Sequence, residues 1–435
     1  MTRARPFDPY PTLIRGALLV GLLPGFGLGL CLLVAMAFQW EIGPIWLPLV
    51  QAHGHAQVFG FTALFVFGVG TQILPRFLSV PPARPRQVQL AGILVGVGVG
   101  VRFLLQPLGP GSARNGGLML AAALELVGAT LFATAMGELA QKSVQPRASW
   151  QDWVRLGLAS LTLGYVLNLA ASLSLAGGRT VVSPALEEGL LHLGIWGFIV
   201  PTTLAVGMKI FPQFLILRPA RAQAFRPALI AYGAGVGLIA AAWLGQEWRP
   251  ELFAAASWMR LAGWLTQAAA VLACVGALRV YEPAARESGL PHISNPTRLW
   301  FRLAFAWLLL AVALGLAYAI REVAAGAPAN FVEASAQRHA LTMGYLLPLL
   351  VGMAGRILPG FSGQMTRQPR VLAALVWLLL TGALLRVGGE LLGGYAGPGR
   401  ILMALGASLA FGAFAWFAWL LWPTLGRRPG AAPSP

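Results

Sequence analysis

Three histidines, His55, His192 and His339, occupy matching positions along the chain. Each is followed by an apolar segment and, 20 positions later, by a proline (75−55, 212−192 and 359−339). Imidazole is a good ligand for haem iron and for other metals. A histidine embedded in a membrane is also costly to leave without a partner. Three histidines in one register therefore predict a metal or haem site.

The segments that begin at these histidines share further features. They read HAQVFGFTALFVFGVGTQILPRF, HLGIWGFIVPTTLAVGMKIFPQF and HALTMGYLLPLLVGMAGRILPGF. In each segment a glycine and an aromatic residue stand five and six positions after the histidine, and a phenylalanine stands two positions after the proline. Agreement at this many positions indicates an internal triplication. Twenty helical residues span roughly 30 Å, the thickness of a bilayer core, so we expect the histidines at one membrane face and the prolines at the other.

The composition is that of a membrane protein. The chain is 57% hydrophobic and 10% charged, with a mean hydropathy of +0.71. Soluble proteins contain about 25% charged residues. We therefore predict an all-α polytopic protein in a lipid bilayer. Its net charge of +17 is explained by basic loops rather than by nucleic acid, for which no binding motif is present.

Twelve transmembrane helices are predicted from the apolar runs. Their approximate limits are 13–38, 51–75, 88–107, 116–139, 152–175, 188–211, 227–245, 252–280, 299–320, 335–358, 370–391 and 401–422. The histidine helices are the second, sixth and tenth, which favours three pseudo-symmetric four-helix units. We place these units at 1–148 (with His53 and His55), 149–292 (with His192) and 293–435 (with His339).

Basic residues set the expected orientation. The N-terminus and the even-numbered loops carry twenty of the Lys and Arg residues that we assign to loops, against six on the other side. By the positive-inside rule both termini are expected to be cytoplasmic, with the three histidines near the outer face.

Several other side chains are candidates for the site. His53 and His55 lie about 200° apart on a helix, so only one of them can ligate a given metal from one face; the repeat register favours His55. Arg102 and Arg386 each stand 27 positions after a proline (102−75 and 386−359). They could pair with the propionates of a haem held between the helices, or extend to the headgroups.

Four acidic and basic positions leave alternatives open. Glu125 and Arg260 fall within spans, where they could pair with each other, belong to a proton path or serve structure alone. Glu187 and Glu188 precede His192 and could orient it or help to bind a cation, although acids are common in the first turn of a helix.

The local sequences HGHAQVFGF and RHALTMGYLLPLLVGMAGRILPG resemble the NnrS family, bacterial membrane proteins that contain haem and copper and are linked to nitric oxide metabolism. That family is similar in fold to subunit I of the haem-copper oxidases. The resemblance implies that His55 (or His53) and His339 are axial haem ligands, and that His192 matches a copper-binding position. The haem would be b-type, because the chain has no CxxCH motif for covalent attachment.

The chain departs from the oxidases in ways that bear on function. The oxidases have two further copper ligands on the seventh helix, whereas the seventh span here contains no histidine, so it stays open whether copper binds. The resemblance implies a haem-binding protein of the bacterial inner (plasma) membrane that acts in nitric oxide metabolism or the nitrosative-stress response, with nitric oxide as a small gaseous ligand. The alternatives are a metal-free transporter or permease, and a quinone- or oxygen-linked oxidoreductase without a complete copper centre.

Overall fold

The computed structural model describes residues 8–285, 295–361, 368–394 and 397–426. Some positions used in the sequence analysis lie outside the described residues. They are His292, the expected unit boundary at 292/293, and six arginines of the orientation argument, Arg3, Arg5, Arg286, Arg367, Arg427 and Arg428. Within the described part of the chain every regular element is a helix. The α-helices are α1 (Tyr10–Val20), α2 (Leu28–Ala37), α3 (Trp46–His55), α4 (Ala63–Leu78), α5 (Pro85–Leu105), α6 (Ser112–Gln141), α7 (Ser149–Ala176), α8 (Pro184–His192), α9 (Val200–Phe214), α10 (Phe225–Trp248), α11 (Phe253–Leu278), α12 (Asn295–Ala325), α13 (Phe331–His339), α14 (Leu347–Phe361), α15 (Pro369–Leu391) and α16 (Gly399–Leu421).

Shorter helical segments join these helices. The π-helical segments are η1 (Gly21–Gly27), η3 (Ala56–Thr62), η4 (Leu193–Ile199) and η7 (Ala340–Leu346), and the 3-10 segments are η2 (Gly43–Ile45), η5 (Ala222–Ala224), η6 (Pro250–Leu252) and η8 (Trp422–Gly426).

Twelve spans in the described residues are long and apolar enough to cross a membrane, which confirms the predicted number. They are Tyr10–Ala37, Gly43–Leu78, Pro85–Leu105, Ser112–Gln141, Ser149–Ala176, Pro184–Phe214, Ala222–Trp248, Pro250–Leu278, Thr297–Ala325, Phe331–Phe361, Pro369–Leu391 and Gly399–Leu425. The protein is therefore a multi-pass, all-helical membrane protein.

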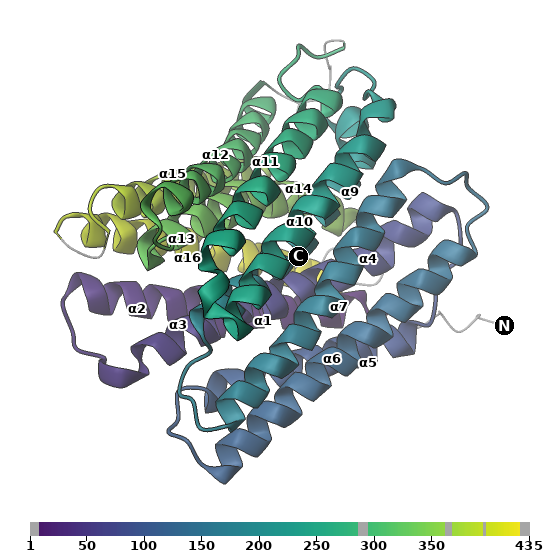
Figure 1. Cartoon of the computed structure of the whole chain (residues 1–435). Coiled ribbons are helices and arrows are strands. Elements are labelled where there is room, and N and C mark those ends of the chain that lie inside the picture. The colour runs from purple at the N-terminus through teal and green to yellow at the C-terminus, as the bar shows by residue number, and fades with distance from the viewer. Residues whose placement is uncertain (1–7, 286–294, 362–367, 395–396, 427–435) are drawn as a thin grey trace.

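The three histidine helices form the centre of the bundle. Their most apolar windows are 72%, 83% and 72% buried inside the protein, against 39–56% for the other nine spans. Neighbouring helices surround them, and the pairs α5–α6, α10–α11 and α15–α16 make the most extensive contacts (Figure 1). Further contacts of α6 with α7, of α11 with α12 and of α16 with α2 attach one more helix to each of these pairs. The division into three units remains a prediction.

The histidines lie inside their helices, not at the ends where the sequence placed them. The helices begin at Gly43, Pro184 and Phe331, which is 12, 8 and 8 residues before the histidine (55−43, 192−184 and 339−331). Eight residues correspond to about 12 Å of helix. The sequence underestimates the second and third of these helices because their first two turns contain charged residues, Glu187 and Glu188 in one and Glu333 and Arg338 in the other.

Two of these early helix starts are held by capping hydrogen bonds. The Ser183 hydroxyl accepts a bond from the backbone N–H of Leu186. The Asn330 side chain accepts from the backbone N–H of Glu333, whose carboxylate accepts in turn from the N–H of Asn330. Such caps satisfy N–H groups that a helix start leaves unpaired.

A π-helical segment follows each histidine in the same register. The segments η3, η4 and η7 all begin one residue after the histidine and end seven residues after it. A π-helical segment shifts backbone hydrogen bonds and leaves carbonyl groups available to other donors. Two tyrosine hydroxyls bond such carbonyl groups. Tyr165 donates to the carbonyl of Phe59, and Tyr232 donates to the carbonyl of Trp196, both at 2.6 Å. Phe59 and Trp196 each lie four positions after a histidine, so the repeat extends to the hydrogen bonding.

Candidate functional site

His55 is buried and engaged by a carboxylate. Its Nε2 lies 2.8 Å from Oε2 of Glu125 on α6, and the same oxygen accepts a bond of 2.9 Å from the Asn168 amide on α7. The ring of Phe59, one turn later, stacks on the imidazole at 5.2 Å between centroids. Nδ1 of His55 is buried and has no hydrogen-bond partner among the described residues. The ring is therefore held firmly from one side and enclosed on the other.

Arg102 belongs to the same polar network. Its guanidinium donates to the Asn168 oxygen and, at 2.9 Å, to Gln106, which in turn bonds Gln51 on the histidine helix. Arg102 is 1% exposed, so it does not extend to the lipid headgroups. One of its terminal nitrogens has no partner among the described residues.

His192 is held by an amide instead of a carboxylate. The Gln267 side chain on α11 donates to Nε2 of His192 at 3.1 Å, and Trp264 packs edge-on against the imidazole. Gln267 and Glu125 stand in equivalent places. A Cβ on Gly98 would lie 2.5 Å from Cγ of Glu125, and one on Gly235 would lie 2.6 Å from Cγ of Gln267. Both glycines come 23 positions after a repeat proline (98−75 and 235−212). At each glycine two helices approach closely, and this approach brings the partner side chain to its histidine.

His339 obtains its carboxylate from a different helix. In the third repeat the matching glycine, Gly382, faces Ala410, which has no polar side chain. Glu390 on α15 takes the role: it lies 3.3 Å from Nδ1 of His339 and 3.0 Å from Arg386. Nδ1 also donates to the Ser335 carbonyl at 2.8 Å. Arg386 is 5% exposed and therefore forms a buried ion pair.

His53 faces away from the His55 network. Its Nδ1 lies 2.9 Å from the carbonyl oxygen of Gly25 in the first span. Gly25 follows Pro24 and has non-helical dihedral angles (φ −79°, ψ −109°), and its carbonyl also accepts from the backbone N–H of Leu28. A Cβ on Gly29 would lie 2.6 Å from the His53 ring, so glycine provides the room for the imidazole.

The charged groups around His53 differ from those around His55. His339 and Arg386 are near enough to His53 for their charges to act on its ring. The charges that act on His55 are those of Arg102 and Glu125. The structure thus groups His53 with His339 and Arg386, and His55 with Arg102 and Glu125.

Two interpretations of the acidic residues are wrong. Glu125 does not pair with Arg260: Glu125 bonds His55 and Asn168, and Arg260 forms a two-bond ion pair with Glu322 at 2.8 and 2.9 Å. The alternative that Glu188 orients His192 is likewise replaced, because Glu188 pairs with Arg338 at 3.3 Å while Gln267 holds the imidazole.

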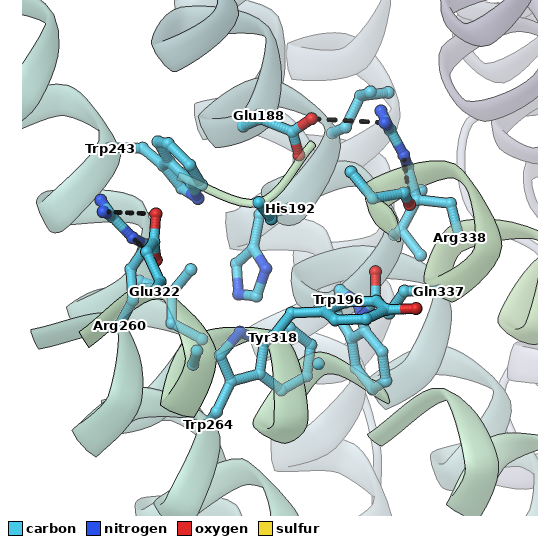
Figure 2. A pocket seen from close by; sticks show the side chains of 17 residues that line it. Glu188, His192, Trp196, Trp243, Arg260, Trp264, Tyr318, Glu322, Gln337 and Arg338 are labelled. Atoms are coloured by element: carbon cyan, nitrogen blue, oxygen red, sulfur yellow. Dashed lines mark hydrogen bonds and ion pairs between the residues drawn. The ribbon is translucent and has the colours of Figure 1, made fainter. Parts of the chain in front are cut away.

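A pocket surrounds His192. Its volume is about 90 Å³. Figure 2 shows the His192 imidazole between three tryptophans, with the Arg260–Glu322 pair on one side and the Arg338–Glu188 pair on the other. The walls come from α8, η4, α10, α11, α12 and α13.

Sequence reasoning missed Gln267, Glu322 and Glu390. Glu322 and Glu390 are charged residues close to the ends of apolar spans, and a systematic inspection of such positions would have found them. Gln267 carries no charge, so only its spacing relates it to the repeat. It lies 32 residues after Gly235 (267−235), and Glu125 lies 27 residues after Gly98 (125−98).

No group of three or more His, Cys, Asp or Glu side chains suited to a metal ion occurs in the part of the chain that the structure describes. Single imidazoles are what the fold offers.

The family model for NnrS protein matches residues 18–428, nearly the whole chain. The comparison with curated proteins found no match. A twelve-span helical membrane protein with repeated histidine helices, matched over almost its full length by this model, belongs to the NnrS family.

Proposed function

We propose that this protein binds haem in a bacterial inner membrane and acts in nitric oxide metabolism or the nitrosative-stress response. One observation carries the haem proposal: His53 and His339 each direct Nδ1 at a backbone carbonyl oxygen. A carbonyl only accepts, so Nδ1 carries the hydrogen and Nε2 keeps its lone pair. Histidines that ligate metals have this arrangement, with the second ring nitrogen donating to a carbonyl or carboxylate.

The same argument favours His53 over His55 as the partner of His339. Nε2 of His55 is already bonded to Glu125, and Nδ1 of His55 is buried. His55 then acts from the opposite face of the helix and fixes the position of the segment that bears His53. The earlier preference for His55 rested on repeat register alone.

Arg386 fits the role of a propionate partner. One terminal nitrogen of its buried guanidinium has no partner among the described residues, while the other bonds Glu390. A guanidinium with a free donor is well matched to a carboxylate. Arg102 also has an unpartnered nitrogen, but it lies in the His55 network, so it would serve a cofactor only on that side.

Bound haem would supply one-electron chemistry and an iron that can bind NO. The protein would hold the two imidazoles in the correct tautomer and exclude water from them. Copper at His192 remains a proposal of its own, to be tested by metal analysis of the purified protein. Both termini are proposed to be cytoplasmic.

An optical spectrum of the purified, haem-replete protein tests the proposal. We expect a Soret band of a six-coordinate low-spin haem, which changes on reduction and again when NO is added. A protein expressed with ample haem and purified intact, but without a Soret band, would refute it. A Soret band that is insensitive to NO would retain haem binding and reject NO as the ligand.

A further inference from the structure

The two histidines proposed as haem ligands are held by different groups. Nδ1 of His53 lies 2.9 Å from a neutral oxygen, the carbonyl of Gly25. Nδ1 of His339 lies 2.8 Å from the Ser335 carbonyl and, in addition, 3.3 Å from Oε1 of Glu390. His53 therefore has a neutral acceptor at Nδ1, whereas His339 has a neutral acceptor and a carboxylate.

The carboxylate of Glu390 is fixed in this position. Its side chain is buried, and its Oε1 accepts a hydrogen bond of 2.5 Å from the Ser335 hydroxyl and lies 3.0 Å from Nη2 of Arg386. Nδ1 of His339 faces the same oxygen. If the carboxylate turned away, these buried donors would lose an acceptor, which is unfavourable. The contact between Glu390 and His339 is therefore a stable part of the site.

The charge of Arg386 does not distinguish the two histidines. It acts on the ring of His53 and on the ring of His339. The charge of Glu390, by contrast, is among those that act on His339 and is not among those that act on His53. Glu390 is therefore the group that makes the surroundings of the two imidazoles unequal.

Another histidine of the described chain also contacts a carboxylate, but through the other ring nitrogen. Nε2 of His55 lies 2.8 Å from Oε2 of Glu125. Nε2 is the nitrogen that His53 and His339 keep available for a metal, so Glu125 occupies the ligating position of its histidine. Glu390 instead lies behind the ring of His339, on the side away from the ligating nitrogen.

We propose that Glu390 is a positioning residue of the haem site, which makes His339 the stronger electron donor of the two axial imidazoles. The inference rests on the proposed function. A carboxylate at the second ring nitrogen of a ligating histidine fixes the ring and raises the basicity of the ligand. A more basic ligand favours the oxidised, more positive iron. Glu390 thus holds the reduction potential of the haem below the value that two carbonyl-bonded histidines would give.

A redox titration of the purified, haem-loaded full-length protein, followed at the Soret band, tests this with Glu390→Gln. The amide keeps the size of the side chain and removes its charge. We expect the midpoint potential to rise by about 59 mV, the equivalent of a tenfold change in the ratio of reduced to oxidised haem. Glu125→Gln is the matched control, because it makes the same exchange beside His55. It should leave the potential unchanged.

Histidine NMR separates an effect through the ring from a general effect of charge. In protein with 15N-labelled histidine and reduced, diamagnetic haem, the two axial rings are identified by their contacts with the haem. We expect one Nδ1–H proton, that of His339, at lower field than the other. Glu390→Gln should move this signal and leave the second signal, that of His53, in place.

A conservative variant provides for the case that Glu390→Gln does not fold. Glu390→Asp keeps the charge and withdraws the oxygen, so its potential should lie between those of the parent protein and Glu390→Gln, or above that of the parent if it alone is folded. Equal potentials of the parent and the folded variants would overturn the proposal. So would equal shifts in Glu390→Gln and Glu125→Gln, or a shifted potential with both Nδ1–H signals unmoved.

These failures differ from a failure of the proposed function. A purified protein without a Soret band rejects haem binding, and the inference about Glu390 falls with it. A protein with a Soret band whose potential does not respond to Glu390 keeps the haem and rejects this inference alone.

Discussion

His53 and His339 are fixed in the same tautomer by two different helices: Nδ1 of His53 bonds the Gly25 carbonyl at 2.9 Å, and Nδ1 of His339 bonds the Ser335 carbonyl at 2.8 Å. Gly25 lies in a break of the first span, whereas Ser335 lies one turn before His339 on its own helix. Two distinct backbone solutions thus leave the same ring nitrogen, Nε2, available on each histidine.

This relationship predicts opposite effects for two neighbouring histidines. His53→Ala and His339→Ala should each remove most of the bound haem, because each takes away an axial ligand. His55→Ala should retain haem, because it removes a partner of Glu125 instead. The Soret absorbance per mole of purified protein measures this. Haem loss in His55→Ala with full retention in His53→Ala would reverse the assignment.

Removal of Glu125 should destabilise the protein. Its Oε2 accepts from both His55 and Asn168, so Glu125→Ala leaves two buried polar groups unpaired, at a cost of about 2–5 kcal/mol in the free energy of unfolding. Glu125→Gln keeps an acceptor oxygen and should cost less than half as much. Denaturant titration in detergent compares the two; equal losses would show that the carboxylate charge, not the acceptor, is what matters.

The glycine contacts give a matched pair two residues apart. A Cβ on Gly98 would lie 2.5 Å from Glu125 Cγ and 2.7 Å from the Ala121 carbonyl, whereas a Cβ on Gly100 meets nothing within 4 Å. Gly98→Ala must push α5 and α6 apart and should lower the free energy of unfolding by about 1–3 kcal/mol. Gly100→Ala should cause no loss. If thermal unfolding places the two variants at the same midpoint, the close approach of α5 and α6 is incorrect.

The Arg260–Glu322 pair should behave as a buried ion pair. Arg260→Met leaves the 3% exposed Glu322 without its partner and should cost about 3–5 kcal/mol. The double variant Arg260→Met with Glu322→Leu should be more stable than Arg260→Met alone, because no charge is left buried. Thermal unfolding of both variants and of the parent protein decides this, and a double variant less stable than the single one contradicts it.

Membrane orientation can be tested by labelling of single cysteines. Val144, in the loop after α6, and Leu108, in the loop after α5, have exposed side chains. In a Cys31→Ala background, a membrane-impermeant maleimide added to intact cells should label Leu108→Cys and not Val144→Cys. The reverse pattern would place both termini outside the cytoplasm.

The sequence by itself determined the class of the protein, the number of spans and the register of the three histidines. These are local properties: a run of apolar residues long enough to cross a bilayer is visible in the run itself, and the spacing of a histidine and a proline needs no knowledge of what surrounds them. The family resemblance likewise came from short linear stretches, and the family model confirmed it.

Only the tertiary structure decided the partners of those histidines. Glu125, Gln267 and Glu390 reach them from helices 70, 75 and 51 residues away (125−55, 267−192 and 390−339). Helices that are apolar on nearly every face give little indication of which face meets which neighbour. The distinction between His53 and His55 depends on where the backbone of another span presents a carbonyl group. The position of the histidines within their helices depends on caps and ion pairs that stabilise polar helix turns within the protein.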